Sequence, residues 1–99
     1  MRNSQNDAVR TLLQAFTQLS TAEECHAFLE DICTIKEIHD MAQRLQTAIL
    51  LDRGCSYQKI SDEVGISTAT ISRVNRCLNY GSGGYRNVID RLEKTEETT

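Results

Sequence analysis

The chain has 99 residues, and its 11 lysines and arginines against 14 aspartates and glutamates give a formal net charge of -3. This length fits one compact domain and excludes both a second independent core and a dinucleotide-binding enzyme fold. A hydrophobic content of 39% with 25% charged residues is typical of a folded chain rather than a disordered one. The longest apolar run, Ala48–Leu51, is far shorter than the roughly 20 residues that span a bilayer, and residues 1–7 lack the apolar segment of a secretory signal. We therefore expect a cytoplasmic protein that does not associate with membranes.

The chain contains no proline and only five glycines, which favours helices joined by short turns. The alternating β-branched and aromatic pattern of strands is scarce, so we expect an all-α fold. The charge is unevenly distributed. Residues 1–43 hold three basic and seven acidic residues, whereas residues 44–91 hold seven basic and four acidic ones. The middle of the chain can therefore offer a basic surface to nucleic acid although the whole chain is acidic.

In chain order, an apolar stripe at three- and four-residue spacing predicts the first helix. Its members are Val9, Leu12, Leu13, Phe16 and Leu19. Ser20 and Thr21 each precede a glutamate by three residues, which is the capping-box pattern that opens a second helix. A further capping box, Thr34 with Glu37, opens a third helix that ends near Gly54.

The domain organisation expected from this pattern is simple. Residues 1–7 would form a flexible N-terminus, residues 8–94 a single helical domain, and residues 95–99 a frayed tail. Within the domain, Gly81–Gly84 would be a flexible loop before a last helix that begins at about Tyr85. Because the apolar stripes are long for so small a chain, we expect a homodimer, with a compact monomeric bundle as the alternative.

The cysteines and histidines do not form a recognisable metal or catalytic motif. The four cysteines are 8, 22 and 22 residues apart, and none belongs to a Cys-x-x-Cys pair. We expect no metal site and interpret the cysteines as small, mostly buried thiols. His26 and His39 have no evident nucleophile or orienting group beside them, so we do not expect an enzyme.

Residues 57–78 have the spacing of a helix-turn-helix. Two short helices are expected on either side of Gly65, over residues 57–64 and 68–79, and Ser67 would cap the second helix. The residues expected to pack the two helices together are Ile60, Ser61, Val64, Ile66, Ile71 and Val74.

The second of these helices carries small, hydrogen-bonding and arginine side chains, and there is no Asp or Glu from Ser67 to Leu78. Such a surface suits the DNA major groove, where hydroxyls and arginines contact base edges and phosphates. The start of the first helix would contact the DNA backbone. The candidate DNA-binding residues are Gln58, Lys59, Ser67, Thr68, Ala69, Thr70, Ser72, Arg73 and Arg76.

Four segments carry a family resemblance, namely Cys33–Glu37, Met41–Leu45, Arg53–Gly54 and Ser67–Gly81. They closely resemble the YerC/YecD family, relatives of the tryptophan repressor, and the resemblance covers roughly residues 8–94. It implies an all-helical, intertwined homodimer whose two reading heads face adjacent major grooves of double-stranded DNA.

The resemblance also indicates an effector site. In the tryptophan repressor two arginines enclose the indole ring, and Arg44 and Arg73 match their positions, while Thr34 and Cys33 match the part of the opposing subunit that closes the pocket. The repressor has a glycine directly after its second arginine, where this chain has Val74, whose side chain would occupy that space or join the core. We therefore expect no cofactor, and tryptophan or another small effector stays an open alternative.

These patterns predict a sequence-specific DNA-binding transcriptional regulator, a repressor rather than an activator because nothing resembles a polymerase-contacting module. A protein–protein adaptor that reuses the helix-turn-helix shape and a tryptophan-responsive repressor are the alternatives. A steep dependence of affinity on salt distinguishes DNA binding from the adaptor.

Overall fold

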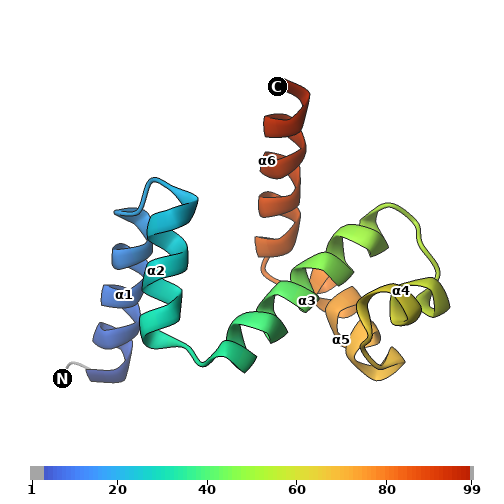
Figure 1. Cartoon of the computed structure of the whole chain (residues 1–99), viewed down its shortest axis with the longest axis horizontal. Helices are drawn as coiled ribbons and strands as arrows, with labels where there is room; N and C mark the ends of the chain where they lie inside the picture. The colour runs from blue at the N-terminus through green and yellow to red at the C-terminus, as the bar shows by residue number, and fades with distance from the viewer. Residues whose placement is uncertain (1–3, 99) are drawn as a thin grey trace. The chain divides into compact units, whose positions relative to one another are not determined.

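The computed structural model describes the backbone of residues 4–98 and the side chains of residues 5–95 (Figure 1). Every regular element in that part of the chain is a helix, which confirms the all-α prediction. No helix there is long and apolar enough to cross a membrane. The helices are α1 (Ser4–Thr17), α2 (Ala22–Ile32), α3 (Ile35–Asp52), α4 (Tyr57–Val64), α5 (Thr68–Tyr80) and α6 (Gly84–Thr98). The chain divides into two compact units, Met1–Ile38 and His39–Thr99.

In the first unit, the cap of α2 forms as the sequence predicts. Thr21 is the N-cap, and its hydroxyl oxygen accepts a hydrogen bond from the Glu24 backbone N–H at 3.1 Å. The Glu24 carboxylate in turn accepts hydrogen bonds from the hydroxyls of Ser20 (3.0 Å) and Thr21 (3.2 Å), which hold the pKa of Glu24 below its ordinary value. Local side-chain chemistry therefore fixes where α2 begins.

The packing inside this unit is light. The rings of Phe16 on α1 and Phe28 on α2 meet edge to face, with centroids 5.2 Å apart and planes at 71°. No residue of α2 is fully buried, and the predicted stripe of α1 is exposed, Leu13 to 59% and Val9 to 53%. Ile35, at the start of α3, is 75% exposed. The first unit therefore forms helices with apolar faces that it does not itself cover.

The second unit contains the core, which consists of two apolar clusters. One joins α3, α5 and α6, and the other joins α3 to α4 and α5. The buried members of the first are Ala48, Val74, Leu78 and Ile89, and those of the second are Leu50, Ile60 and Ile71. Because α3 and α5 contribute to both clusters, they hold α4 on one side and α6 on the other.

An ion pair also attaches α6 to this core, and a glycine fixes the end of α5 before it. Arg86, in the first turn of α6, forms an ion pair with Asp52, the last residue of α3, and this contact raises the pKa of Arg86. Gly81 ends α5 with its backbone N–H bonded to the Cys77 carbonyl oxygen, and a Cβ placed on it would lie 2.3 Å from that oxygen. A side chain at position 81 would therefore require the end of α5 to move.

Several expectations at the chain ends and the cysteines can now be compared with the structure. Residues 1–3 and 99 lie outside the described residues, while residues 4–7 belong to α1 and most of the expected tail belongs to α6. The flexibility predicted for residues 1–7, 81–84 and 95–99 stays a prediction. The expectation of mostly buried cysteines is wrong for the chain by itself. Three of them are half-buried and Cys77 is exposed.

Candidate nucleic-acid interface

Helices α4 and α5 form the helix-turn-helix, and local chemistry fixes both ends of α4 (Figure 1). The Ser56 hydroxyl caps its start by accepting a hydrogen bond from the Lys59 backbone N–H at 3.2 Å. Gly65 ends it in the left-handed conformation, with φ of 80°, which confirms the predicted turn glycine. No atom lies within 4 Å of a Cβ built on Gly65, so the requirement for glycine is conformational rather than steric.

The turn is further held by polar contacts that the sequence did not indicate. The Ser61 hydroxyl donates to the Ile66 carbonyl oxygen at 2.8 Å, across the turn. The Gln43 side-chain amide donates to the Val64 carbonyl oxygen at 3.3 Å and so ties α3 to the end of α4. Ser61 is therefore both the small residue expected there and a bonding partner of the turn.

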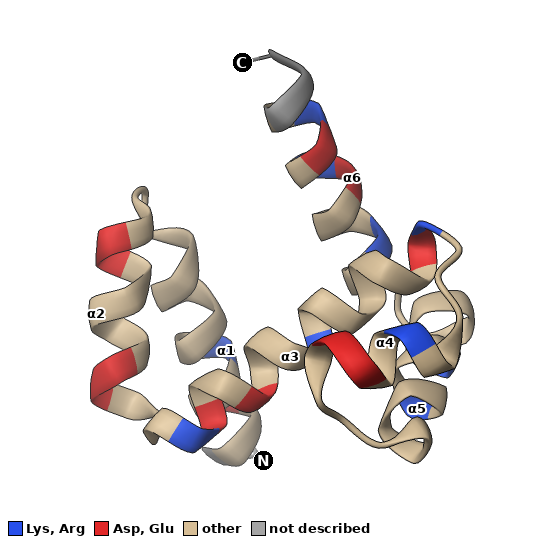
Figure 2. Cartoon of the chain, turned by 45° about the vertical axis from the view of Figure 1, so that its right-hand side comes forward, with Lys and Arg blue, Asp and Glu red and all other residues tan. Residues whose placement is uncertain are grey.

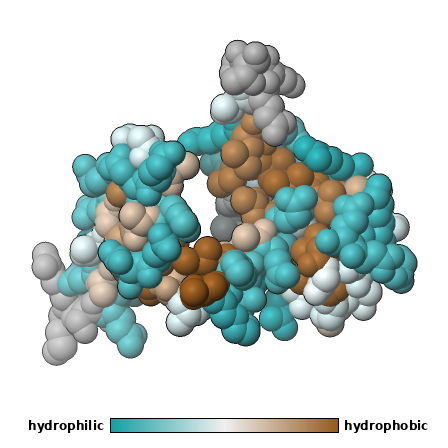
Figure 3. Space-filling model, viewed as in Figure 1, coloured by the Kyte–Doolittle hydropathy of each residue, from teal (hydrophilic) through white to brown (hydrophobic). Residues whose placement is uncertain are grey.

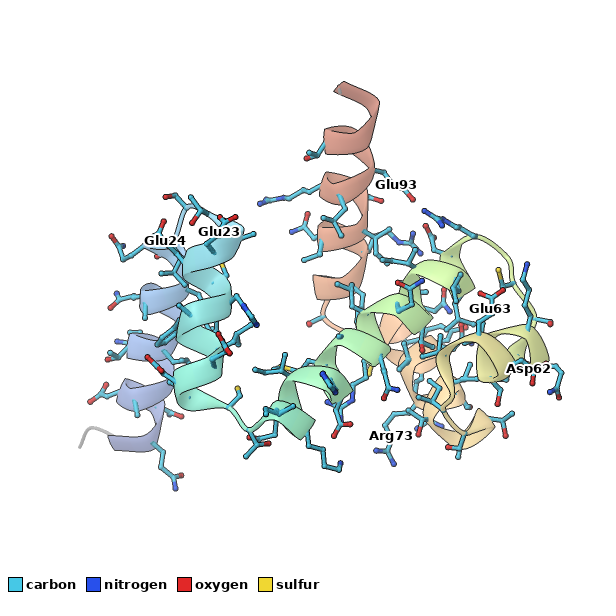
Figure 4. The ribbon with its side chains drawn as sticks, in the orientation of Figure 1. Glu23, Glu24, Asp62, Glu63, Arg73 and Glu93 are labelled. Atoms are coloured by element: carbon cyan, nitrogen blue, oxygen red, sulfur yellow. The ribbon has the colours of Figure 1, made fainter. Side chains whose placement is uncertain are left out.

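The predicted reading residues of α5 lie on its exposed side, while Ile71, Val74 and Leu78 are buried in the core. Figure 4 shows Arg73 extending away from α5. At Ser67 and along α5, the exposed candidates are Ser67, Thr68, Ala69, Ser72, Arg73 and Arg76. Figure 2 shows basic but no acidic residues on α5. This side of the helix is therefore a positive surface bordered by small side chains.

Ser67 and Thr70 differ from the other candidates because their side chains already have structural partners. The Ser67 hydroxyl oxygen accepts from the Thr70 backbone N–H at 3.2 Å, which caps α5. The hydroxyls of the two residues also form a hydrogen bond, at 3.1 Å, and Thr70 is half-buried. Both residues fix the start of α5, and their contacts with DNA stay predictions.

The two candidates on α4 are also engaged, with residues that the sequence analysis did not single out. Gln58 Nε2 donates to Asp62 Oδ1 at 2.9 Å, and Lys59 Nζ lies 4.0 Å from Glu63 Oε1. All four side chains are exposed. The four-residue spacing that brings such side chains together on a helix was visible in the sequence and could have identified both carboxylates.

The predicted effector residues are divided between the two units. In the second unit, Arg44 borders a hollow of about 260 Å³ that also touches Thr70, Ser67 and Asp40. In the first unit, Cys33 and Thr34 are cap residues: the Cys33 N–H bonds to the Leu29 carbonyl oxygen at 2.8 Å, and Thr34 forms the predicted capping box with Glu37.

Val74, the residue that replaces the repressor's glycine, is 3% exposed and packs with Ala48, Leu78 and Ile89. Of the two outcomes expected for Val74, the structure has the second, in which its side chain joins the core.

A second hollow, of about 560 Å³, lies near the C-terminal end of α5 and has a mostly apolar lining that includes Leu45, Cys77, Tyr85 and Val88. Burial raises the pKa of Tyr85 above its ordinary value. Among the described residues, no three His, Cys, Asp or Glu side chains are grouped as a metal ion would require.

Comparison with known proteins agrees with this geometry. Residues 7–93 match the family described as Trp repressor protein. The uncharacterised protein YerC of Bacillus subtilis (strain 168) is 51% identical over 85 residues, which are 86% of this chain and 82% of YerC. A TrpR-like protein from Eubacterium eligens ATCC 27750 has a crystal structure with a TM-score of 0.84 at 47% identity, covering 88% of this chain and 90% of that one. A Staphylococcus aureus protein described as a candidate Trp repressor has a crystal structure with a TM-score of 0.83 at 41% identity. The match covers 93% of this chain and 89% of that one. The resemblance seen in the sequence is confirmed, and the chain belongs to the Trp repressor family.

Proposed function

We propose that this protein is a sequence-specific DNA-binding transcriptional regulator, a repressor, which places α5 in the major groove and acts as a homodimer. The observation that carries the proposal is the exposed side of α5, where Arg73 and Arg76 follow the small residues Thr68, Ala69 and Ser72. This side has no carboxylate, and the buried side of the same helix holds it rigidly on α3.

The dimensions and chemistry of α5 suit the groove. A helix is about 10–12 Å across, close to the roughly 12 Å width of the major groove of B-DNA. Arginine can bond to guanine in two places or contact phosphate, and a threonine or alanine methyl can meet a thymine methyl. The positive end of the helix dipole at the start of α5 also favours a nearby phosphate.

The homodimer is supported by two apolar helix faces that one chain leaves uncovered, one in each unit. Leu12, Leu13 and Phe16 of α1 are exposed, and so are Val88 and Leu92 of α6. Figure 3 shows apolar residues over much of the visible face of α6. Large contiguous apolar surfaces are rare on monomers and mark interaction sites. A second copy would cover them and would place two reading helices about 34–36 Å apart, one turn of DNA.

We further propose that DNA binding does not require tryptophan. The Val74 side chain belongs to the core and occupies the space that a bound indole would need. Arg44 and Arg73, with Thr34 and Cys33 of a second copy, would form an effector site only for a ligand that leaves Val74 in place. An adaptor that binds only proteins is the competing function.

The test is a titration of the protein against two labelled duplexes, one of random sequence and one selected by the protein from a randomised pool. Fluorescence anisotropy at 50 and 200 mM salt, with and without tryptophan, gives the affinities and their salt dependence. We expect binding that weakens steeply with salt and does not respond to tryptophan. Absence of binding to both duplexes at low salt would favour the adaptor.

Substitution of the two arginines of α5 tests whether this helix contacts DNA. Arg73→Ala and Arg76→Ala should each weaken binding by about 1–3 kcal/mol where the arginine contacts a base, or reduce the salt slope by about 0.9 where it contacts a phosphate. Arg10→Ala, which removes the same charge from an exposed position of α1, is the matched control and should change little. Unchanged affinity in both α5 variants would exclude this helix as the reading helix.

A further inference from the structure

The two side chains of α4 that would contact the DNA backbone are each held by a carboxylate of the same helix. Asp62 accepts a hydrogen bond from the Gln58 amide at 2.9 Å, and the Glu63 carboxylate lies 4.0 Å from the Lys59 ammonium group. Each carboxylate thus engages, in the free protein, a side chain that the proposed contact with the DNA backbone would use.

The net charges of α4 and α5 are opposite. Helix α4 carries one lysine against two carboxylates, whereas α5 carries two arginines and no carboxylate. Figure 4 shows Asp62 and Glu63 together on α4. In the proposed complex, the helix that would contact only phosphates is net acidic, while the helix that would read bases is net basic.

We propose that Asp62 and Glu63 are specificity-determining residues that weaken binding to DNA of arbitrary sequence. This inference rests on the proposed function. Binding to random DNA depends almost entirely on phosphate contacts. There the Lys59 ammonium group keeps its contact with Glu63 and neutralises no phosphate, and both carboxylates repel the polyanion. On a preferred site, base contacts from α5 hold the start of α4 against the DNA backbone. Lys59 and Gln58 then leave the carboxylates of Glu63 and Asp62 and contact phosphates instead.

The two residues act as positioning residues, Glu63 through Lys59 and Asp62 through Gln58. Because the pairs are exposed, their individual effects are modest, about two- to five-fold in an equilibrium constant. Folding should be unaffected, since neither carboxylate is buried or contributes to the two apolar clusters.

The experiment measures the affinities of Glu63→Gln, Asp62→Asn and the double variant for the random-sequence duplex and the selected duplex, over a series of salt concentrations. Each single variant should bind random DNA about two- to five-fold more tightly, with a smaller gain on the selected duplex, so that the ratio of the two affinities falls. For Glu63→Gln on random DNA, the slope of log affinity against log salt should steepen by about 0.9, as one more phosphate is neutralised.

Two controls make the result decisive. Glu23→Gln removes one negative charge from an exposed position of α2 and should leave both affinities unchanged. In a Lys59→Met background, Glu63→Gln should lose the steepened salt slope. The proposal is overturned if the variants gain nothing, if Glu23→Gln gains as much, or if both duplexes gain equally. Failure of the wild-type protein to bind any duplex would instead overturn the proposed function.

Discussion

At the scale of single residues, nearby positions of α5 serve different purposes, one in the core and one on the proposed DNA-binding side. Val74 is 3% exposed and packs with Ala48 and Ile89, whereas Ser72, two residues earlier, is exposed on the proposed reading side. The helical period separates the two side chains by about 200°, so one faces the core and the other faces solvent. Substitutions at these two positions should therefore affect different properties.

Val74→Ala should lower the free energy of unfolding by about 1–3 kcal/mol, because it removes two methyl groups from a packed cluster. Ser72→Ala should leave stability within about 0.5 kcal/mol of the wild type but weaken DNA binding. Urea denaturation and DNA titration at 10 °C on both variants check the pair. Equal effects of the two variants on stability would contradict the orientation of α5.

At the scale of helices and turns, two glycines are required for different physical reasons. Gly65 has positive φ and open space around its Cβ position, whereas Gly81 has φ of -85° but no room beside the Cys77 carbonyl oxygen. Gly65→Ala should cost about 1–2 kcal/mol of stability through backbone strain. Gly81→Ala should cost more, because the end of α5 must move. The midpoints of urea unfolding at constant slope measure both. A larger loss for Gly65→Ala would reverse this assignment.

The elements that sequence reasoning predicts well are those determined by local chemistry. The caps at Thr21, Thr34 and Ser67 and the turn at Gly65 follow from residue types within four positions of one another. The span predicted for α4, residues 57–64, agrees with the structure, but the Ser56 cap that fixes its start was not predicted.

What the sequence did not predict depends on contacts across the fold. The bond from Gln43 to Val64 joins residues 21 positions apart. The exposure of the cysteines depends on which neighbouring elements pack beside each of them. Hydrophobic spacing predicted four members of the stripe correctly as a face of α1, whereas Leu19 lies beyond its end at Thr17, and spacing cannot indicate whether the same chain covers that face.

At the scale of the whole molecule, the uncovered apolar faces and the proposed DNA binding lead to one prediction. If a second copy covers α1, a charge placed in its stripe should separate the copies, because a buried unpaired charge is costly. Leu13→Glu should therefore give a monomer in sedimentation equilibrium, whereas Gln14→Glu, a matched change at an exposed polar position of the same helix, should remain a dimer.

The same two variants connect the assembly to function. A monomer places one reading helix on DNA instead of two, so Leu13→Glu should bind the selected duplex with at least about ten-fold lower affinity, while Gln14→Glu should resemble the wild type. The wild-type melting temperature should rise with protein concentration, as it does for any protein whose folded state is a dimer. A wild-type protein that sediments as a monomer and melts independently of concentration would show that one chain is stable with these faces exposed. Each chain would then bind DNA on its own, and the α5 helices of two bound chains would have no fixed spacing.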